Sequence, residues 1–289
     1  MYLGPPGLLL QVRDPKPDFD MPADRGGATN TTLSGGMRVD FPGKHPRTFS
    51  PSWDKMSDDE YALLEKIYLR QIGPGPFILI PEPARWNYLT GEQSSGAETG
   101  NVSAVTLSSG VLTSDTAQSH SFFRSYKWAT TAINGATFVN NAPNNALPLG
   151  FVTNVGMQWC FSGWVRTDTA SQTIIPQINW YTSTGAYIST SGSSFGPAAN
   201  TWTQVYVAAT APATAVYGVT QYAHATGTAV NIWVDDQMLE YGKTSPGSHL
   251  AGRGQPLVSF TKYGETYNWA NYNLSGGQHS ADGEFLEVS

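Results

Sequence analysis

The feature that most constrains the fold is a series of short apolar runs, separated by turn residues, between residues 104 and 240. Each run has the length of a β-strand, and glycine, proline, serine or asparagine residues separate the runs. The candidate strands are Ala104–Leu112, His120–Thr130, Gln158–Asp168, Ile174–Tyr181, Tyr187–Thr190, Thr201–Ala208, Val216–His224 and Ala229–Glu240. Strands at this spacing are typical of two-layer antiparallel folds, so we predict a β-sandwich of the jelly-roll type.

One α-helix is predicted ahead of this series, over about residues 57–71. Ser57 and Glu60 form an S-x-x-E capping box, in which each side chain bonds the backbone N–H of the other. Gly73 is expected to take the left-handed conformation beyond the helix, and the run Phe77–Ile80 reads as a buried strand. Apolar and aromatic residues recur at helical spacing between these points: Tyr61, Leu63, Leu64, Ile67 and Tyr68.

Composition argues against several classes of function. Only 13% of the 289 residues are charged, the net charge is −6, and no run of Lys or Arg occurs, so binding to nucleic acid or to an anionic membrane lacks an electrostatic basis. No segment approaches the roughly 20 apolar residues of a membrane span, and no signal peptide is visible, so we expect synthesis in a cytoplasm. The single cysteine, Cys160, excludes an intrachain disulfide and reads as a small buried apolar residue.

The chain is predicted to contain a discontinuous domain, residues 1–90 and 243–289, and an inserted domain, residues 91–242. The Gly/Ser-rich passage Glu92–Gly100 reads as a linker, and the Pro/Gly-rich stretch Asp14–Gly35 reads as an extended arm. Further candidate strands are Gly7–Val12, Gly36–Phe41, Leu257–Tyr263, Asn271–Leu274 and Phe285–Val288. The predicted fold class is therefore all-β dominated: a split β-sandwich or barrel with one helix, plus an inserted β-sandwich.

One strand of the inserted domain is a candidate for carbohydrate binding. In the run 174–181, alternation places Ile178 and Trp180 in the core and Gln177, Asn179 and Tyr181 on the opposite, open face. A pyranose ring has an apolar C–H face that an aromatic ring covers, and hydroxyls that amide side chains bond. The row therefore has the composition that a sugar groove needs, although a merely solvated face remains an alternative.

Other aromatic residues of the inserted domain are assigned separately. Tyr222 and Trp159 are further candidates for sugar contact. Trp164 and Trp202 are expected in the core or at its rim.

The region from residue 36 to about 90 resembles the N-terminal part of minor tail proteins of tailed actinobacteriophages, the distal-tail-like ring components. That family has an S-x-E-E-Y-x-x-L-E helix, a G-P-G-P-F turn and a short strand ending in proline, which match Ser57–Glu65, Gly73–Phe77 and Ile80–Pro81 here. The G-R-G-Q-P turn at 252–256 and the end of the chain at 285–288 resemble the C-terminal segment of the same family. The resemblance implies a structural protein of a virion tail tip. Its partners would be its own copies in a six-fold or three-fold ring, the tail tube and other tail-tip proteins.

The inserted domain resembles the jelly-roll carbohydrate-binding modules found on glycanases and on phage tail proteins. The pattern that carries this is S-x-W-V-R, I-x-W-Y, W-T-x-V, A-P and V-D-D-x-x-L-E in order, between Ser162 and Glu240. The resemblance implies contact with host cell-wall polysaccharide. It also implies a structural Ca²⁺ held by Asp235 and Asp236, and no cofactor beyond that.

Catalysis is not expected. The five histidines, His45, His120, His224, His249 and His279, show no metal-binding spacing, and no nucleophile elbow or phosphate-binding loop occurs. We therefore interpret the chain as a structural minor tail protein of a siphophage-like virion whose jelly roll contacts host glycans. Two alternatives stay open: a secreted carbohydrate-binding module that assists a glycan-degrading enzyme, and a purely architectural jelly roll.

Overall fold

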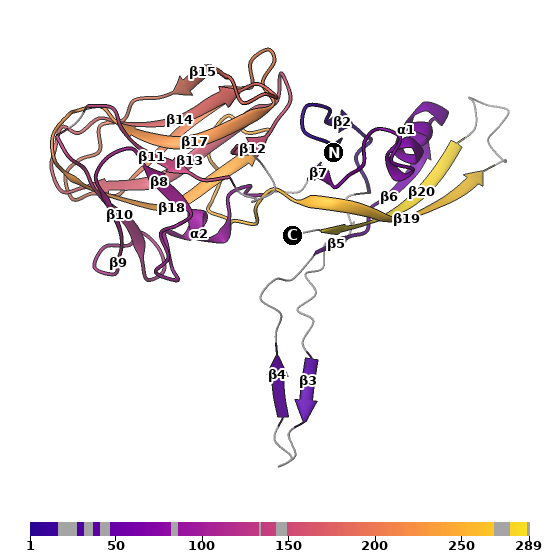
Figure 1. Ribbon diagram of the computed structural model, residues 1–289, viewed down its shortest axis with the longest axis horizontal. Helices are drawn as coiled ribbons and strands as arrows, with labels where there is room; N and C mark the ends of the chain where they lie inside the picture. The colour runs from indigo at the N-terminus through magenta and orange to yellow at the C-terminus, as the bar shows by residue number, and fades with distance from the viewer. Residues whose placement is uncertain are drawn as a thin grey trace. The chain divides into compact units, whose positions relative to one another are not determined.

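The structure is a computed structural model that describes residues 1–16, 28–31, 37–40, 47–81, 86–132, 134–142, 149–268 and 278–287. The chain divides into two compact units, of which the first is Met1–Ala84 with Pro256–Ser289 and the second is Arg85–Gln255 (Figure 1). The junctions therefore lie at 84/85 and 255/256, where the sequence suggested 90/91 and 242/243. No helix among the described residues has the length and apolar character to cross a membrane.

The first unit is built on a seven-stranded antiparallel sheet to which both ends of the chain contribute. Its strand order is β2-β1-β7-β19-β20-β5, with β6 also paired to β20. Leu257 lies opposite Ile78 in this sheet, which joins the C-terminal segment to the N-terminal one. The strands are β1 (Tyr2–Gly4), β2 (Leu10–Gln11), β5 (Thr48–Phe49), β6 (Ser52–Met56), β7 (Phe77–Ile80), β19 (Leu257–Asn268) and β20 (Gln278–Glu287).

Helix α1 (Asp58–Tyr68) forms where the capping box predicts it. Ser57 Oγ accepts from the Glu60 N–H at 3.3 Å, and Glu60 Oε2 accepts from the Ser57 N–H at 2.8 Å. The helix ends before the predicted residue 71, because Arg70 takes the left-handed conformation with φ 56°. The Gln71 N–H then bonds the Lys66 carbonyl at 2.9 Å and closes the last turn, so the expectation that Gly73 caps the helix is wrong.

Several predicted segments of the first unit fall wholly or partly outside the described residues. The arm Asp14–Gly35 is described only at residues 14–16 and at β3 (Ala28–Thr31), which pairs antiparallel with β4 (Met37–Asp40). The candidate strand Asn271–Leu274 also lies outside them.

The second unit is a two-layer β-sandwich, and Figure 1 shows its layers facing each other. The five-stranded sheet holds β9 (Val111–Asp115), β10 (Ser125–Ala129), β13 (Gln158–Thr167), β16 (Thr203–Thr210) and β18 (Asn231–Tyr241). The six-stranded sheet holds β8 (Val105–Leu107), β11 (Ala136–Asn140), β12 (Phe151–Val152), β14 (Ile174–Tyr181), β15 (Tyr187–Gly192) and β17 (Tyr217–His224). The predicted class, predominantly β with a β-sandwich, is confirmed.

A short helix, α2 (Gly91–Ser95), replaces the predicted linker. Thr90 Oγ1 accepts from the Gln93 N–H at 3.2 Å, and Gln93 Oε1 accepts from the Thr90 N–H at 3.0 Å. Gln93 and Ser94 are buried, so this segment belongs to the packed interior. The prediction of a single helix was therefore wrong, because the T-x-x-Q sequence is itself a capping box.

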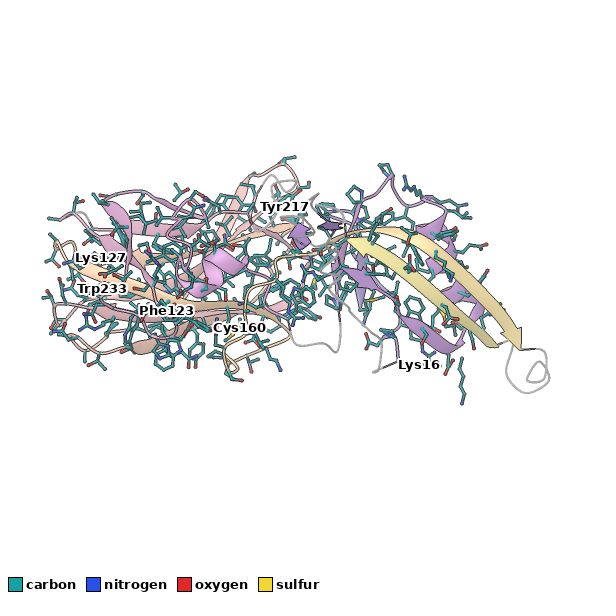
Figure 2. All side chains as sticks on the ribbon, turned by 90° about the horizontal axis from the view of Figure 1, so that it is seen from below. Lys16, Phe123, Lys127, Cys160, Tyr217 and Trp233 are labelled. Atoms are coloured by element: carbon teal, nitrogen blue, oxygen red, sulfur yellow. The ribbon has the colours of Figure 1, made fainter. Side chains whose placement is uncertain are left out.

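The core of the second unit lies between the two sheets and is rich in aromatic side chains. These include Trp128, Phe138, Phe151, Trp159, Phe161, Trp180 and Tyr222, all at most 2% exposed. Cys160, labelled in Figure 2, is fully buried as predicted. Burial, together with the charge of Glu240, raises the pKa of its thiol to about 12, so the reactive thiolate is not populated near neutral pH.

A β-bulge interrupts the pairing of β13 with β18. Ser162 pairs with Met238 and Trp164 with Asp235, so two residues of β18 face the single residue Gly163. The bulge residue Asp236 has φ 48°. This extra residue shifts the alternation of side chains by one position along β18.

Asn87 fastens the two ends of the second unit together. Its side-chain nitrogen donates to the carbonyls of Gln237 (3.0 Å) and Leu250 (2.8 Å), and its side-chain oxygen accepts from the Leu239 N–H at 3.0 Å. The Arg253 N–H donates to the Asn87 carbonyl at 3.0 Å. The segments of sequence that precede residue 91 and follow residue 242 are thus bonded into the sandwich, which explains why the junctions lie outside 91–242.

These contacts predict how the second unit behaves in isolation. The fragment 85–255 should unfold cooperatively, whereas the fragment 95–242 lacks Asn87 and leaves its buried partners without hydrogen bonds. Two of these partners, the Gln237 carbonyl and the Leu239 N–H, remain in the shorter fragment. Each orphaned group costs about 1–3 kcal/mol, so this fragment should be less stable by at least about 2 kcal/mol. Urea unfolding of both fragments, and of 85–255 carrying Asn87→Ala, measures this. Equal stability of the two fragments would contradict the assignment.

Candidate functional site

The outer face of β14 carries the row that alternation predicts. Ile178 and Trp180 are 0% exposed and face the core. Gln177, Asn179 and Tyr181 are half-buried and lie on the outer face of the six-stranded sheet. The predicted division of this strand into a core side and an open side is therefore confirmed.

Residues of the two neighbouring strands extend this row. Gln221 on β17 donates through Nε2 to Gln177 Oε1 at 2.6 Å, and Thr190 on β15 donates through Oγ1 to Asn179 Oδ1 at 2.6 Å. These bonds use the side-chain oxygens of both amides. Among the described residues, the side-chain nitrogens of Gln177 and Asn179 make no hydrogen bond, so their N–H donors have spare capacity.

An exposed aromatic ring completes the outer face. Tyr187 is 60% exposed, and its ring packs edge-on against Tyr181 with centroids 5.9 Å apart. Its hydroxyl shares a hydrogen bond of 2.9 Å with Thr190 Oγ1. The sequence analysis missed Tyr187, Thr190 and Gln221 as site residues. It placed all three on strands, but the register that brings them beside Asn179 and Gln177 is not readable from one strand's alternation.

Trp159 and Tyr222 do not belong to this face. Both are 0% exposed. The Trp159 indole donates to Thr153 Oγ1 at 2.7 Å inside the sandwich, and Tyr222 packs against Phe161 with ring centroids 4.9 Å apart. The expectation that these two rings contact sugar is wrong, because alternation turns each of them toward the opposite sheet.

Trp164 and Trp202 are both half-buried, so neither lies in the core, and Trp164 sits on β13 opposite Gln204 and Asp235. The imidazole of His120 stacks on Trp164 with ring centroids 3.9 Å apart and meets Trp202 edge-on at 5.7 Å. His120 belongs to the loop between β9 and β10, so this stack holds the loop against the five-stranded sheet.

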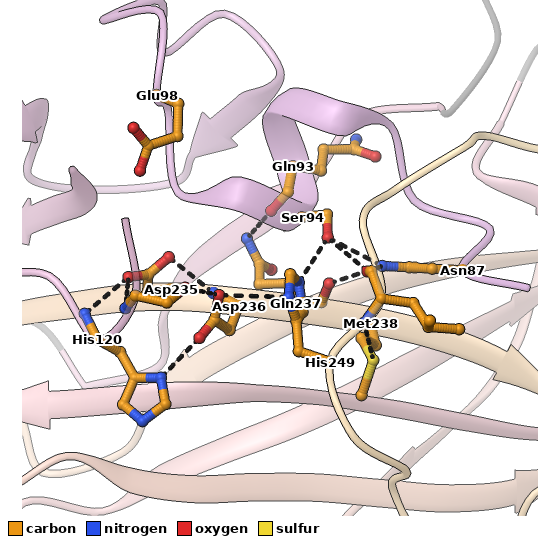
Figure 3. Close-up of polar contacts among 12 residues, drawn as sticks. Asn87, Gln93, Ser94, Glu98, His120, Asp235, Asp236, Gln237, Met238 and His249 are labelled. Atoms are coloured by element: carbon orange, nitrogen blue, oxygen red, sulfur yellow. Dashed lines mark hydrogen bonds and ion pairs between the residues drawn. The ribbon is translucent and has the colours of Figure 1, made fainter. Parts of the chain in front are cut away.

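Asp235 and Asp236 of β18 hold the same loop by hydrogen bonds (Figure 3). Asp235 Oδ2 accepts the backbone N–H groups of His120 (2.8 Å) and Ser121 (3.2 Å), and its Oδ1 accepts the Asp236 N–H at 2.8 Å. Asp236 Oδ2 lies 2.6 Å from His120 Nδ1, and its Oδ1 accepts the Ser121 hydroxyl. Burial, followed by the charge of Asp236, raises the pKa of Asp235 to about 7.

The arrangement of these two acids does not fit a calcium ion. Hydrogen bonds engage both carboxylate oxygens of Asp235 and both carboxylate oxygens of Asp236. Gly96 packs closely against Asp235, since a Cβ there would lie 2.6 Å from Asp235 Oδ1 and 3.1 Å from the Arg124 carbonyl oxygen. Calcium prefers six or more oxygen ligands, which these engaged groups do not offer. Among the described residues, no three His, Cys, Asp or Glu side chains converge on one point, so a calcium ion would need backbone carbonyls.

A serine–histidine–aspartate relay is also present in Figure 3. Ser94 Oγ and His249 Nε2 share a hydrogen bond of 3.0 Å, and His249 Nδ1 lies 3.6 Å from Asp236 Oδ1. These are the residue types of a hydrolase triad. Ser94 is 0% exposed, and its hydroxyl also accepts from Asn87 Nδ2 and donates to the Leu250 carbonyl. No substrate reaches such an oxygen, so the relay holds the segment around residue 249 in place.

Several solved structures are similar to about half of this chain. The sequence matches no protein-family profile and no curated protein. The enzymatically active domain of tailspike protein 4 from bacteriophage CBA120 is similar over 54% of this chain and 21% of that one, with 14% identity and a TM-score of 0.40. The CBM22-2 xylan-binding domain from Paenibacillus barcinonensis Xyn10C is similar over 50% of this chain and 96% of that one, with 18% identity and a TM-score of 0.40. The C-terminal family 22 carbohydrate binding module of Clostridium thermocellum Xyn10B is similar over 51% of this chain and 92% of that one, with 19% identity and a TM-score of 0.38.

The pKa of Asp235 predicts a loss of stability as the pH rises. The carboxyl binds its proton more tightly in the folded state, with a pKa of about 7, than in an unfolded chain, where the pKa is about 3.9. Its stabilising contribution is therefore full below about pH 4 and is lost as the pH rises through about 7. As the pH rises from about 4 to about 8, the free energy of unfolding of the parent should therefore fall relative to that of Asp235→Asn. The fall should be on the order of 4 kcal/mol at most.

Urea unfolding between about pH 4 and pH 8 tests this. Asp115→Asn is the matched control. Burial raises the pKa of Asp115, but the hydrogen bonds from the Trp233 indole and the Ala117 N–H outweigh it, so the pKa is lowered. The contribution of Asp115 is present above its unfolded pKa and is lost only at lower pH. A parent and an Asp235→Asn variant with parallel profiles would refute the assignment.

Proposed function

We propose that the outer face of β14 and β15 binds a neutral polysaccharide of the host cell wall. The observation that carries this is the row beside the ring of Tyr181, in which Gln177 and Asn179 have their oxygens engaged and their N–H donors unbonded among the residues that the structure describes. Amide donors fixed in this way recognise sugar hydroxyls at little entropic cost, and an aromatic ring covers the C–H face of a pyranose.

We propose further that the protein is a structural component of a phage tail tip, located in the virion. This rests on the likeness of the segment Ser57–Pro81 to minor tail proteins, whose capped helix and following strand occur here as α1 and β7. Several copies in a ring would present several sandwiches to one cell surface. Such multivalency raises weak binding by about 10²–10⁴ without any new contact.

The groove is tested by the contrast between two adjacent residues. Tyr181→Ala should weaken adsorption to host cell-wall polysaccharide with little change in thermal stability, because the ring lies on the outer face. Trp180→Ala should destabilise the unit by about 3–5 kcal/mol, because it empties the core. Sedimentation with purified cell walls measures adsorption, and thermal unfolding measures stability.

Tyr206→Ala is the matched control for the loss of a tyrosine. Tyr206 is 36% exposed but lies on β16, in the opposite sheet. The Tyr206→Ala variant should adsorb to the cell walls like the parent. If Tyr181→Ala also adsorbs like the parent, the groove lies elsewhere.

The assembly is tested by native mass spectrometry of the full chain. We expect a closed ring with six-fold or three-fold symmetry, since cyclic assemblies satisfy every interface. A monomer at all concentrations, together with absence of the protein from purified virions, would refute the tail-tip role.

A further inference from the structure

The outer face of the five-stranded sheet holds one tryptophan between two cations. Trp233 on β18 lies opposite Lys127 on β10 and opposite Arg166 on β13. Lys127 Nζ is 5.5 Å from the centre of the indole, and the Arg166 guanidinium carbon is 5.1 Å from it. Lys127 and Trp233 are labelled in Figure 2. The three side chains form a single row across neighbouring strands.

The two cations differ in what else they contact. Lys127 Nζ lies 4.0 Å from Asp115 Oδ2, the same oxygen that accepts the Trp233 indole N–H at 2.7 Å. Among the described residues, the Arg166 guanidinium makes no hydrogen bond or ion pair, and the indole of Trp233 is its cation–π partner. The next carboxylate along the chain, Asp168, lies just beyond β13 and instead accepts from the side-chain amide of Asn231 at 2.6 Å.

This arrangement leaves hydrogen-bonding capacity unused at one fixed point. A guanidinium has five N–H donors in a planar fork that matches a carboxylate or a phosphate. Packing on Trp233 restricts the side chain of Arg166, so less rotamer entropy is lost when it binds a ligand. The indole itself is only 6% exposed, which prevents a sugar ring from stacking on it. A ligand approaching this face therefore meets cationic groups and not the aromatic ring.

We propose that Arg166, supported by Trp233 and Lys127, is a binding site for the anionic group of an acidic polysaccharide. Arg166 would donate two N–H groups to the carboxylate of a uronic acid residue or to a phosphodiester, and Lys127 would add a second positive charge. This site lies on the opposite layer from Gln177 and Asn179, so it does not depend on the proposed neutral-glycan groove. The chain would then contact two chemically different parts of a cell wall through two faces of one sandwich.

Isothermal titration of the full chain with three polymers tests the proposal. Polygalacturonate supplies carboxylates, poly(glycerol phosphate) supplies phosphodiesters, and dextran supplies neither. We expect binding to at least one acidic polymer, weakening as NaCl rises from about 50 to about 500 mM, whereas any binding of dextran to the neutral-glycan face should not depend on NaCl. The polymer that binds identifies the anion. Failure of both acidic polymers to bind would overturn the proposal.

Variants separate this site from a general effect of charge. Arg166→Gln should weaken binding of the acidic polymer at least about tenfold, and Arg166→Lys should give an intermediate loss because it keeps the charge but not the fork. Lys243→Gln removes one charge beyond the far end of β18 and should bind like the parent. Equal losses in Arg166→Gln and Lys243→Gln would overturn the proposal, since net charge alone would then explain binding.

Two cross-measurements keep the two faces distinct. Tyr181→Ala should bind the acidic polymer like the parent, and Arg166→Gln should adsorb to neutral cell-wall polysaccharide like the parent. A loss of acidic-polymer binding in Tyr181→Ala would place the anion on the β14 face and refute the site at Arg166. Thermal unfolding of each variant establishes that the comparison is between folded proteins.

Discussion

The second unit depends on the bulge in β18 opposite Gly163. Because Asp236 takes the left-handed conformation there, the side chain of Gln237 faces the interior and Asp235 faces the loop before β10. Inside, Gln237 accepts from the Asn140 amide at 2.9 Å and donates to the Gln93 carbonyl at 2.7 Å, which joins both sheets to α2. The residue opposite must be glycine, since a Cβ there would collide with the Tyr222 hydroxyl. One extra residue thus fixes the two layers, the helix and a surface loop at once.

Polar side chains in this unit differ in whether their hydrogen-bonding capacity is satisfied. The hydroxyl of Ser94 has three partners and no access to solvent, so a triad-like geometry carries no reactivity. Within the part of the chain that the structure describes, the side chains of Gln177 and Asn179 are oriented by hydrogen bonds to their oxygens, and the guanidinium of Arg166 by the Trp233 ring, while their N–H donors make no hydrogen bond. Recognition needs this second condition, in which a rigid sheet orients a group without satisfying it.

The sequence predicted local structure well and burial unevenly, and the reason differs for each element. A capping box acts within four residues, so Ser57 located α1, and Thr90 would have located α2 had its box been read. Alternation correctly assigned the two faces of β14 because one face of the strand is apolar and the other is polar. It failed for Trp159 and Tyr222, whose burial depends on which sheet faces them. The domain junctions depend on hydrogen bonds of Asn87 to partners about 150 residues away, and no local pattern reports such a contact.

The two ends of the sandwich are bonded to each other within the unit itself. The Arg253 N–H meets the Asn87 carbonyl, and the Gly254 N–H meets the Leu89 carbonyl at 2.8 Å. The entropy of closing this loop of the chain is therefore offset by contacts inside the sandwich. A recipient protein needs only two adjacent points of attachment in a surface loop. The sandwich is in this sense a self-contained insertion, and recombination can exchange the whole second unit in one event while the seven-stranded sheet keeps its sequence.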